Sequence, residues 1–125
     1  MSNTKQTRRV TPGSSETLTS ILETLPDALF VVDDAATIVY ANASAQAMTG
    51  ATSEVLHGNS FWRCAPHLVS TALYRAVRKT RETRALIEVE YVSPVTQSWL
   101  HVHLAPTVGG LILQFHEGRA PARSP

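Results

Sequence analysis

The stretch LPDALFVVDDAATIVYANASAQAMTG, residues 25–50, decides the fold. Its segment ALFVVD is apolar and β-branched, which is typical of a strand, and DAAT forms a turn before a second strand, IVYAN. Asn42 then precedes ASAQAM and can cap a short helix, while Gly50 suits the left-handed position at the end of that helix. The stretch therefore predicts a β-hairpin followed at once by a helix. It contains no Ser-His-Asp arrangement, no metal-ligand spacing and no phosphate-binding loop.

The segments on either side extend this pattern. The preceding run ETLTSILETL, residues 16–25, places apolar side chains at helical spacing, and Pro26 ends it. TSEVLHG, residues 52–58, indicates a second short helix, and HLVSTALYRAVRKTRE, residues 67–82, indicates the longest one, with Leu73 on its apolar face. Three further strands are predicted from their β-rich sequences, namely RALIEVEYV, SWLHVHLAP and GLILQFHE, at residues 84–92, 98–106 and 110–117.

This order of elements favours an α+β fold. It predicts a five-stranded antiparallel sheet with helices on one face and an N-terminal amphipathic helix. If Glu90 stands opposite Trp99, then Glu88 faces His101, and both strands show one apolar and one amphipathic face. On the last strand the same alternation turns three residues inward and three outward, namely Leu111, Leu113 and Phe115 against Ile112, Gln114 and His116.

Length and composition indicate a single globular domain. The chain has 125 residues, of which 43% are hydrophobic and 17% charged. We expect residues 16–117 to form the domain, between a flexible N-terminal lead at residues 1–15 and a flexible C-terminal tail at residues 118–125.

Charge and cysteine content narrow the classes of partner. Between Ser14 and Glu117 there are six Lys or Arg and ten Asp or Glu, whereas the body of a nucleic-acid-binding domain is normally basic. The lone cysteine, Cys64, excludes an internal disulfide framework, and no apolar run reaches the length of a membrane span. We therefore expect a cytoplasmic protein that binds neither nucleic acid nor membrane.

From about Ile21 to Glu117 the chain resembles the PAS sensor domain. LPDALFVVDDAATIVYAN is similar to the family's opening hairpin, with an Asp at the end of the first strand and an Asn after the second. MTGATSEVLHG is similar to its linking helices, and SWLHVHLAP followed by GGLILQFHE is similar to its last two strands, with Trp99 and Pro106 as anchors. The chain departs from the family at the exit, where Glu117-Gly118-Arg119 replaces the family's Asp-Ile-Thr.

The resemblance implies a sensory or regulatory module of a signal-transduction protein, such as a two-component system, rather than an enzyme. It implies coupling to an output kinase or transcription-regulator domain or partner. A pocket between the sheet and the helices would bind a small apolar ligand; the alternative is a purely structural dimerisation domain whose core is filled by its own side chains. The predicted pocket residues are Phe30, Val32, Met48, Leu56, Phe61, Leu73, Leu100, Val102, Leu111, Leu113 and Phe115.

A homodimer is predicted from the apolar stripe of the first helix. In relatives of the PAS family such a helix often packs on the outer sheet face or against its copy in a partner. The outer face would otherwise expose apolar side chains to water. The predicted interface consists of Leu18, Ile21, Leu22, Leu25, Trp99 and Ile112.

No cofactor is predicted. In the flavin-binding branch of the family a cysteine forms an adduct with flavin, but here Phe61 stands at the matching position and Cys64 falls three residues later. Leu100 and Phe115 replace two of that branch's flavin-holding residues. Haem is the less favoured alternative, because Ser70 and Thr71 occupy the turn that carries the haem-ligating histidine in some relatives, and His67 lies about one turn early.

No metal site is predicted either. His101 and His103 share one face of a strand, and two such imidazoles can bind zinc. Zinc normally takes three or four protein ligands, and only Glu88 is at hand in the predicted register. A cross-strand pair between Glu88 and His101 is therefore the favoured interpretation.

Overall fold

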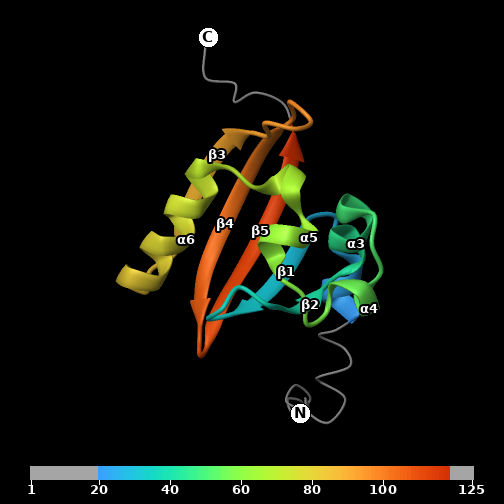
Figure 1. The fold of residues 1–125 in the computed structure, drawn as a ribbon, viewed down its shortest axis with the longest axis horizontal. Helices are drawn as coiled ribbons and strands as arrows, with labels where there is room; N and C mark the ends of the chain where they lie inside the picture. The colour runs from blue at the N-terminus through green and yellow to red at the C-terminus, as the bar shows by residue number, and fades with distance from the viewer. Residues whose placement is uncertain (1–19, 119–125) are drawn as a thin grey trace, which may run out of the picture.

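A computed structural model describes residues 20–118 of the chain as a sheet covered by helices on one face (Figure 1). The predictions for residues 1–15, for Leu18 and for residues 119–125 lie outside this part. The elements, in chain order, are β1 (Ala28–Asp33), β2 (Ile38–Ala41), α3 (Ala43–Thr49), α4 (Ser53–Leu56), α5 (Phe61–Cys64), the 3-10 helix η1 (Pro66–Leu68), α6 (Thr71–Thr83), β3 (Ile87–Val92), β4 (Trp99–Thr107) and β5 (Gly110–Gly118).

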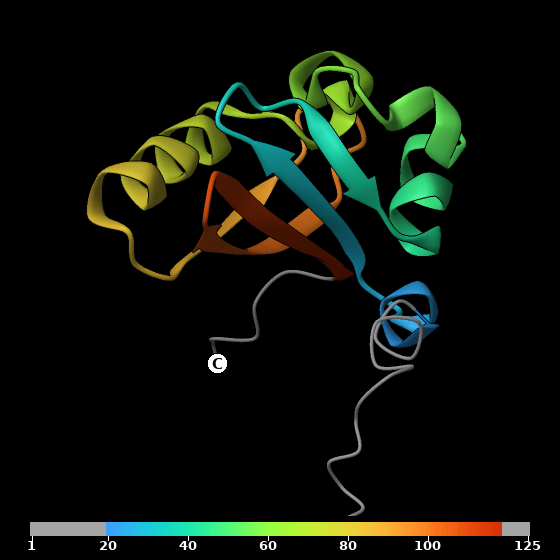
Figure 2. The same ribbon diagram turned by 90° about the horizontal axis from the view of Figure 1, so that it is seen from below.

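The sheet is antiparallel throughout and has the strand order β2-β1-β5-β4-β3. The β1–β2 hairpin and the three-stranded meander β3–β4–β5 are therefore joined by the pairing of β1 with β5. Figure 2 shows the helices, in green and yellow, on one side of the sheet; this side is called the inner face and the other side the outer face. None of the helices within residues 20–118 is long and apolar enough to cross a membrane.

The alternation of side chains confirms the predicted faces of the strands. On β5, Leu111, Leu113 and Phe115 are buried, whereas Ile112, Gln114 and His116 are half-buried or exposed. The first described turn, residues 20–24, is helical and lies beside the start of β1, as the blue coil in Figure 2 shows. The predicted N-terminal helix is thus present as far as the structure describes it.

The predicted register between β3 and β4 is wrong by two residues. Glu90 pairs with His101 instead of Trp99, and Glu88 pairs with His103. A shift of two residues leaves every side chain on its predicted face, so the hydrophobic pattern cannot detect it.

The longest helix also begins later than predicted. Pro66–Leu68 forms a 3-10 helix, and α6 starts at Thr71, where the Ser70 hydroxyl accepts a hydrogen bond from the Leu73 amide at 3.0 Å. The chain between Arg84 and Leu86 is not strand, because Arg84 is the left-handed C-cap of α6 with φ of 56°. Helix α5 was not predicted, since it has only four residues and, unlike the equally short α4, is not followed by a glycine.

Asn42 is the polar centre of the fold. Its side chain is fully buried, and its Oδ1 accepts hydrogen bonds from the amides of Leu29 at 3.0 Å and Ala45 at 2.9 Å. Its Nδ2 donates to the carbonyls of Leu22 at 2.8 Å and Asp27 at 3.1 Å. The predicted helix cap is confirmed, and the same side chain also ties the first helical turn and β1 to α3.

Replacing Asn42 should strongly destabilise the domain. In Asn42→Ala four buried or partly buried backbone groups lose their partner, and each such loss costs about 1–3 kcal/mol. We expect a loss of at least about 2 kcal/mol in the free energy of unfolding, measured by urea denaturation. Asn59→Ala, at an exposed position, is the control. Equal stability of the two variants would contradict the role given to Asn42.

Leu73 tests the packing of α6 on the sheet. It is fully buried with Ala76 and Val77 on the face of α6 that contacts β3 and β4. Leu73→Ala should lower the free energy of unfolding by about 2–5 kcal/mol, the usual cost of truncating a buried leucine. A loss below about 0.5 kcal/mol in chemical denaturation, the scale of surface substitutions, would contradict this placement.

Candidate functional site

The inner face holds the residues predicted to line a pocket. All of them except Met48 are buried members of one apolar cluster, and Met48 packs against it. At the centre Phe30 lies 5.1 Å from Phe61 and 5.7 Å from Phe115, both edge to face, and Phe61 stacks on Phe115 at 5.9 Å between ring centroids. The structure thus brings the predicted pocket residues together, with their aromatic rings packed against one another.

A cleft of about 280 Å³ opens beside this cluster. It lies among α3, η1, the β3–β4 loop and the ends of β4 and β5, and two predicted pocket residues, Met48 and Leu100, line it. Ala47, His67, Leu68, Thr96 and Glu117 complete the walls. The lining is therefore mixed, with buried Leu68 and Leu100 on one hand and exposed Thr96 and Glu117 on the other.

Hydrogen bonds fix the wall formed by η1. A ring nitrogen of His67 lies 2.7 Å from the Met48 carbonyl oxygen, which ties η1 to α3. On the other side the Ser93 hydroxyl donates to the His67 carbonyl at 2.6 Å, and the Tyr91 hydroxyl donates to the Leu68 carbonyl. Burial raises the pKa of the Tyr91 phenol above its ordinary value, so this donor stays protonated into strongly alkaline solution.

Most of the residues considered as flavin or haem sites are engaged in packing or in hydrogen bonds within the protein. Phe61, at the position of the flavin-reactive cysteine, sits in the aromatic cluster, and Cys64 is half-buried against the same core. Ser70 caps α6, Thr71 is exposed, and the His67 ring bonds to a backbone carbonyl. The absence of a cofactor stays a prediction.

The outer face carries two apolar areas separated by a polar band. Cross-strand pairing places Tyr40, Val31, Ile112 and Ala105 in one row across β2, β1, β5 and β4. Trp99 pairs with Gly118, six residues beyond Ile112 along β5, which corresponds to about 20 Å. The structure therefore does not bring together the two outer-face residues of the predicted dimer interface.

The first helical turn lies next to the Tyr40 end of this row. The Tyr40 hydroxyl donates a hydrogen bond to the Glu23 carboxylate, and the Ser44 hydroxyl donates to the Leu25 carbonyl at 2.7 Å. Burial, together with the bond to Glu23, raises the pKa of Tyr40 to about 12. Ile21 remains 52% exposed, whereas Leu22 and Leu25 are half-buried.

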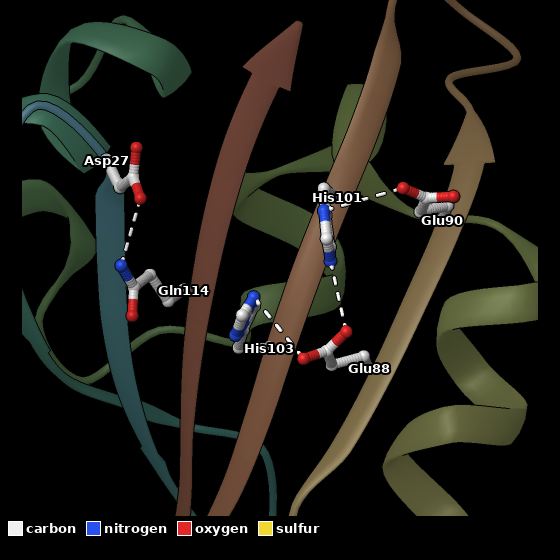
Figure 3. A network of polar contacts seen from close by, with 6 residues as sticks. All are labelled: Asp27, Glu88, Glu90, His101, His103 and Gln114. Carbon is white, nitrogen blue, oxygen red and sulfur yellow. Dashed lines mark hydrogen bonds and ion pairs between the residues drawn. The ribbon is translucent and has the colours of Figure 1, made fainter. Parts of the chain in front are cut away.

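The polar band consists of Asp27, Glu88, Glu90, His101, His103, Gln114 and His116, of which Figure 3 shows all but His116. On one side Asp27 accepts from Gln114 and pairs with His116, both at 2.9 Å. Burial raises the pKa of Asp27, but the hydrogen bonds from His116 and Gln114 outweigh it and hold that pKa below its usual value. On the other side the two histidines of β4 face the two glutamates of β3.

Sequence reasoning found part of this band and missed the rest. The contact between Glu88 and His101 was predicted from alternation, and it exists as a diagonal pair at 3.4 Å. Asp27 was missed because its partners on β5 are 87 and 89 residues away in the sequence. Only the topology, which makes β1 and β5 neighbours, reveals it.

Comparison with solved structures shows the same fold. The PAS domain of nitrogen regulation protein NR(II) from Vibrio parahaemolyticus matches with a TM-score of 0.68 at 16% identity, over 81% of this chain and 97% of that chain. The photoactive yellow protein domain of the sensor histidine kinase Ppr from Rhodospirillum centenum matches with a TM-score of 0.64 at 17% identity, over 85% and 99%.

A third similar structure is a sensory box sensor histidine kinase from Vibrio cholerae, with a TM-score of 0.62 at 17% identity, over 84% of this chain and 92% of that chain. A search of curated protein sequences finds no match. The sequence itself matches the family model described as PAS fold over residues 16–115. Together with the order of the strands and the helices on the inner face, this match shows that the chain belongs to the PAS family.

Proposed function

We propose that this chain is the sensory or regulatory module of a cytoplasmic signal-transduction protein, and that it acts by homodimerisation and not by catalysis. Its output partner would be a kinase or a transcription-regulator domain. Family membership supports this proposal, and similar structures include domains whose names place them in sensor histidine kinases. The side chains within residues 20–118 also suit recognition better than turnover, because the hydroxyl groups of Ser and Thr that donate hydrogen bonds there donate them to backbone carbonyls and not to a His, Asp or Glu side chain.

The packing of the inner face favours signalling through the outer face of the sheet over ligand binding in the core. Phe30, Phe61 and Phe115 occupy the centre of the space in which a ligand would lie, and their rings are in contact. A molecule bound at this centre would have to displace buried aromatic side chains, each of which removes a large apolar area from water. In this proposal the core is the fixed scaffold, and the outer face is the part that communicates.

The observation that carries the homodimer is the apolar row on the outer face. Tyr40, Val31, Ile112 and Ala105 follow one another across four strands, beside a helical turn that exposes Ile21. A second copy that packs its turn and its row against this area would remove both from water. Leu22 and Leu25 lie at the edge of this interface, and Trp99 lies apart from it.

The cleft between α3 and η1 favours a second candidate function, the binding of a small apolar ligand. Its volume of about 280 Å³ is near the lower end of ligand pockets, and Met48, Leu68 and Leu100 supply apolar walls. A solved structure with a TM-score of 0.61 and 21% identity is described as VqmA bound to DPO, which shows a ligand in that protein. Here a ligand would enter beside the aromatic cluster and not replace it.

The homodimer is tested by charging the proposed interface. The wild-type chain should be a dimer by light scattering at high micromolar concentration, and Ile21→Glu combined with Ile112→Glu should give a folded monomer. The reason is that two carboxylates per copy would have to be buried against apolar groups.

Val108→Glu is the matched control, because Val108 is an exposed apolar residue on the β4–β5 hairpin outside the interface. It should leave the dimer intact, and so should Trp99→Glu. A wild type that is monomeric, or a double variant that remains dimeric, would show that this interface is wrong.

The protein should be colourless as purified. Phe61 fills the place of the flavin-reactive cysteine, and neither Ser70 nor Thr71 can replace a haem-ligating histidine. An absorption spectrum of freshly purified protein should therefore show only the aromatic band in the ultraviolet. A Soret band or a flavin spectrum would contradict this prediction.

A further inference from the structure

Three side chains in the polar band converge on one point of the outer face. Glu88, His101 and His103 each offer a ligand atom within 4.8 Å of the other two. Both imidazoles turn Nε2 toward the Glu88 carboxylate, at 3.4 Å for His101 and 3.9 Å for His103 (Figure 3). The corrected register produces this arrangement, because Glu88 lies directly opposite His103 and diagonally opposite His101.

A second carboxylate orients one of the histidines. Glu90 lies directly opposite His101, and its carboxylate is 3.5 Å from Nδ1 of that ring. A histidine that binds a metal through one nitrogen usually donates its other ring N–H to a carboxylate or carbonyl, which fixes its tautomer. His101 has this surrounding, with Nε2 facing the convergence point and Nδ1 facing Glu90.

The remaining polar groups of the band are engaged elsewhere. His116, opposite His101 on β5, pairs with Asp27, and Gln114, opposite His103, donates to the same carboxylate. The band is thereby divided, so that β5 contacts Asp27 while the two β4 histidines face β3. The three candidate ligands, Glu88, His101 and His103, all come from the same chain.

We propose that Glu88, His101 and His103 form a zinc-binding site on the outer face of the sheet. Zinc binds imidazole nitrogen and carboxylate oxygen at about 2.0–2.2 Å, which puts neighbouring ligand atoms about 3.3 Å apart in a tetrahedral site. The side chains of Glu88 and His103 are more than half exposed, so small rotations bring the atoms to that spacing. Three protein ligands leave a fourth position for water or an exogenous ligand.

The donor set selects the class of metal. Two imidazoles suit zinc and other transition metals, whereas calcium and magnesium prefer sites built from oxygen. A metal here would link β3 to β4 in the polar band, where His103 lies two residues along β4 from Ala105 of the apolar row.

The test is isothermal titration of zinc into the full chain, prepared without a histidine tag. The wild type should bind one zinc per chain and should not bind calcium. His101→Ala and His103→Ala should each abolish this stoichiometric binding, and Glu88→Gln should weaken it. Glu90→Gln, at the orienting position, should weaken it about 10–100-fold, the usual effect of removing the partner of a metal-bound histidine.

His57→Ala is the matched control, because it removes an exposed histidine far from the band in the sequence and should leave the affinity unchanged. Far-ultraviolet circular dichroism of each variant verifies that the fold is retained. Cobalt in place of zinc should give the intense visible bands of a tetrahedral site in the wild type and in His57→Ala, and should not give them in His101→Ala or His103→Ala. Absence of stoichiometric zinc binding by the wild type, or undiminished binding by the His101 and His103 variants, would overturn the proposal.

Discussion

The four hydrogen bonds of the Asn42 side chain hold together parts of the domain that no apolar contact alone would orient. Through them the amide of Leu29 on β1, the amide of Ala45 in α3 and the carbonyls of Leu22 and Asp27 meet at one buried group. Because Oδ1 accepts two hydrogen bonds and Nδ2 donates two, the buried amide has no polar atom without a hydrogen-bond partner. The direction in which α3 leaves the sheet, and the place of the first helical turn, both follow from this one residue.

Local rules explain how much of the fold could be predicted from the sequence. The caps at Asn42 and Gly50 and the faces of β4 and β5 depend on neighbouring residues, and the structure confirms them. The pairing of Glu88 with His103 depends on the β3–β4 connection instead, and a register shifted by two residues shows the same alternation. The start of α6 was misplaced because Pro66 opens a 3-10 helix before the Ser70 cap.

The candidate sites were predicted less completely, for a physical reason. Apolar alternation identifies Phe30, Phe61 and Phe115 as inward-facing, but it cannot tell whether their rings enclose a space or fill it. Likewise Trp99 and Ile112 were both correctly placed on the outer face, yet their separation along the sheet depends on register. The polar band between them joins residues from four parts of the chain, and so it became visible only in three dimensions.

The central claim is that the chain fills its own core and communicates through its surface. In this proposal the packed rings of Phe30, Phe61 and Phe115 are the fixed scaffold, and changes of state are left to the outer face and the segments that lie on it. Native mass spectrometry of the chain as purified tests this claim most directly. The account predicts masses equal to those of the polypeptide, with or without one zinc ion per chain, or to whole-number multiples of these masses. A persistent additional mass of a small organic molecule on each chain would contradict it.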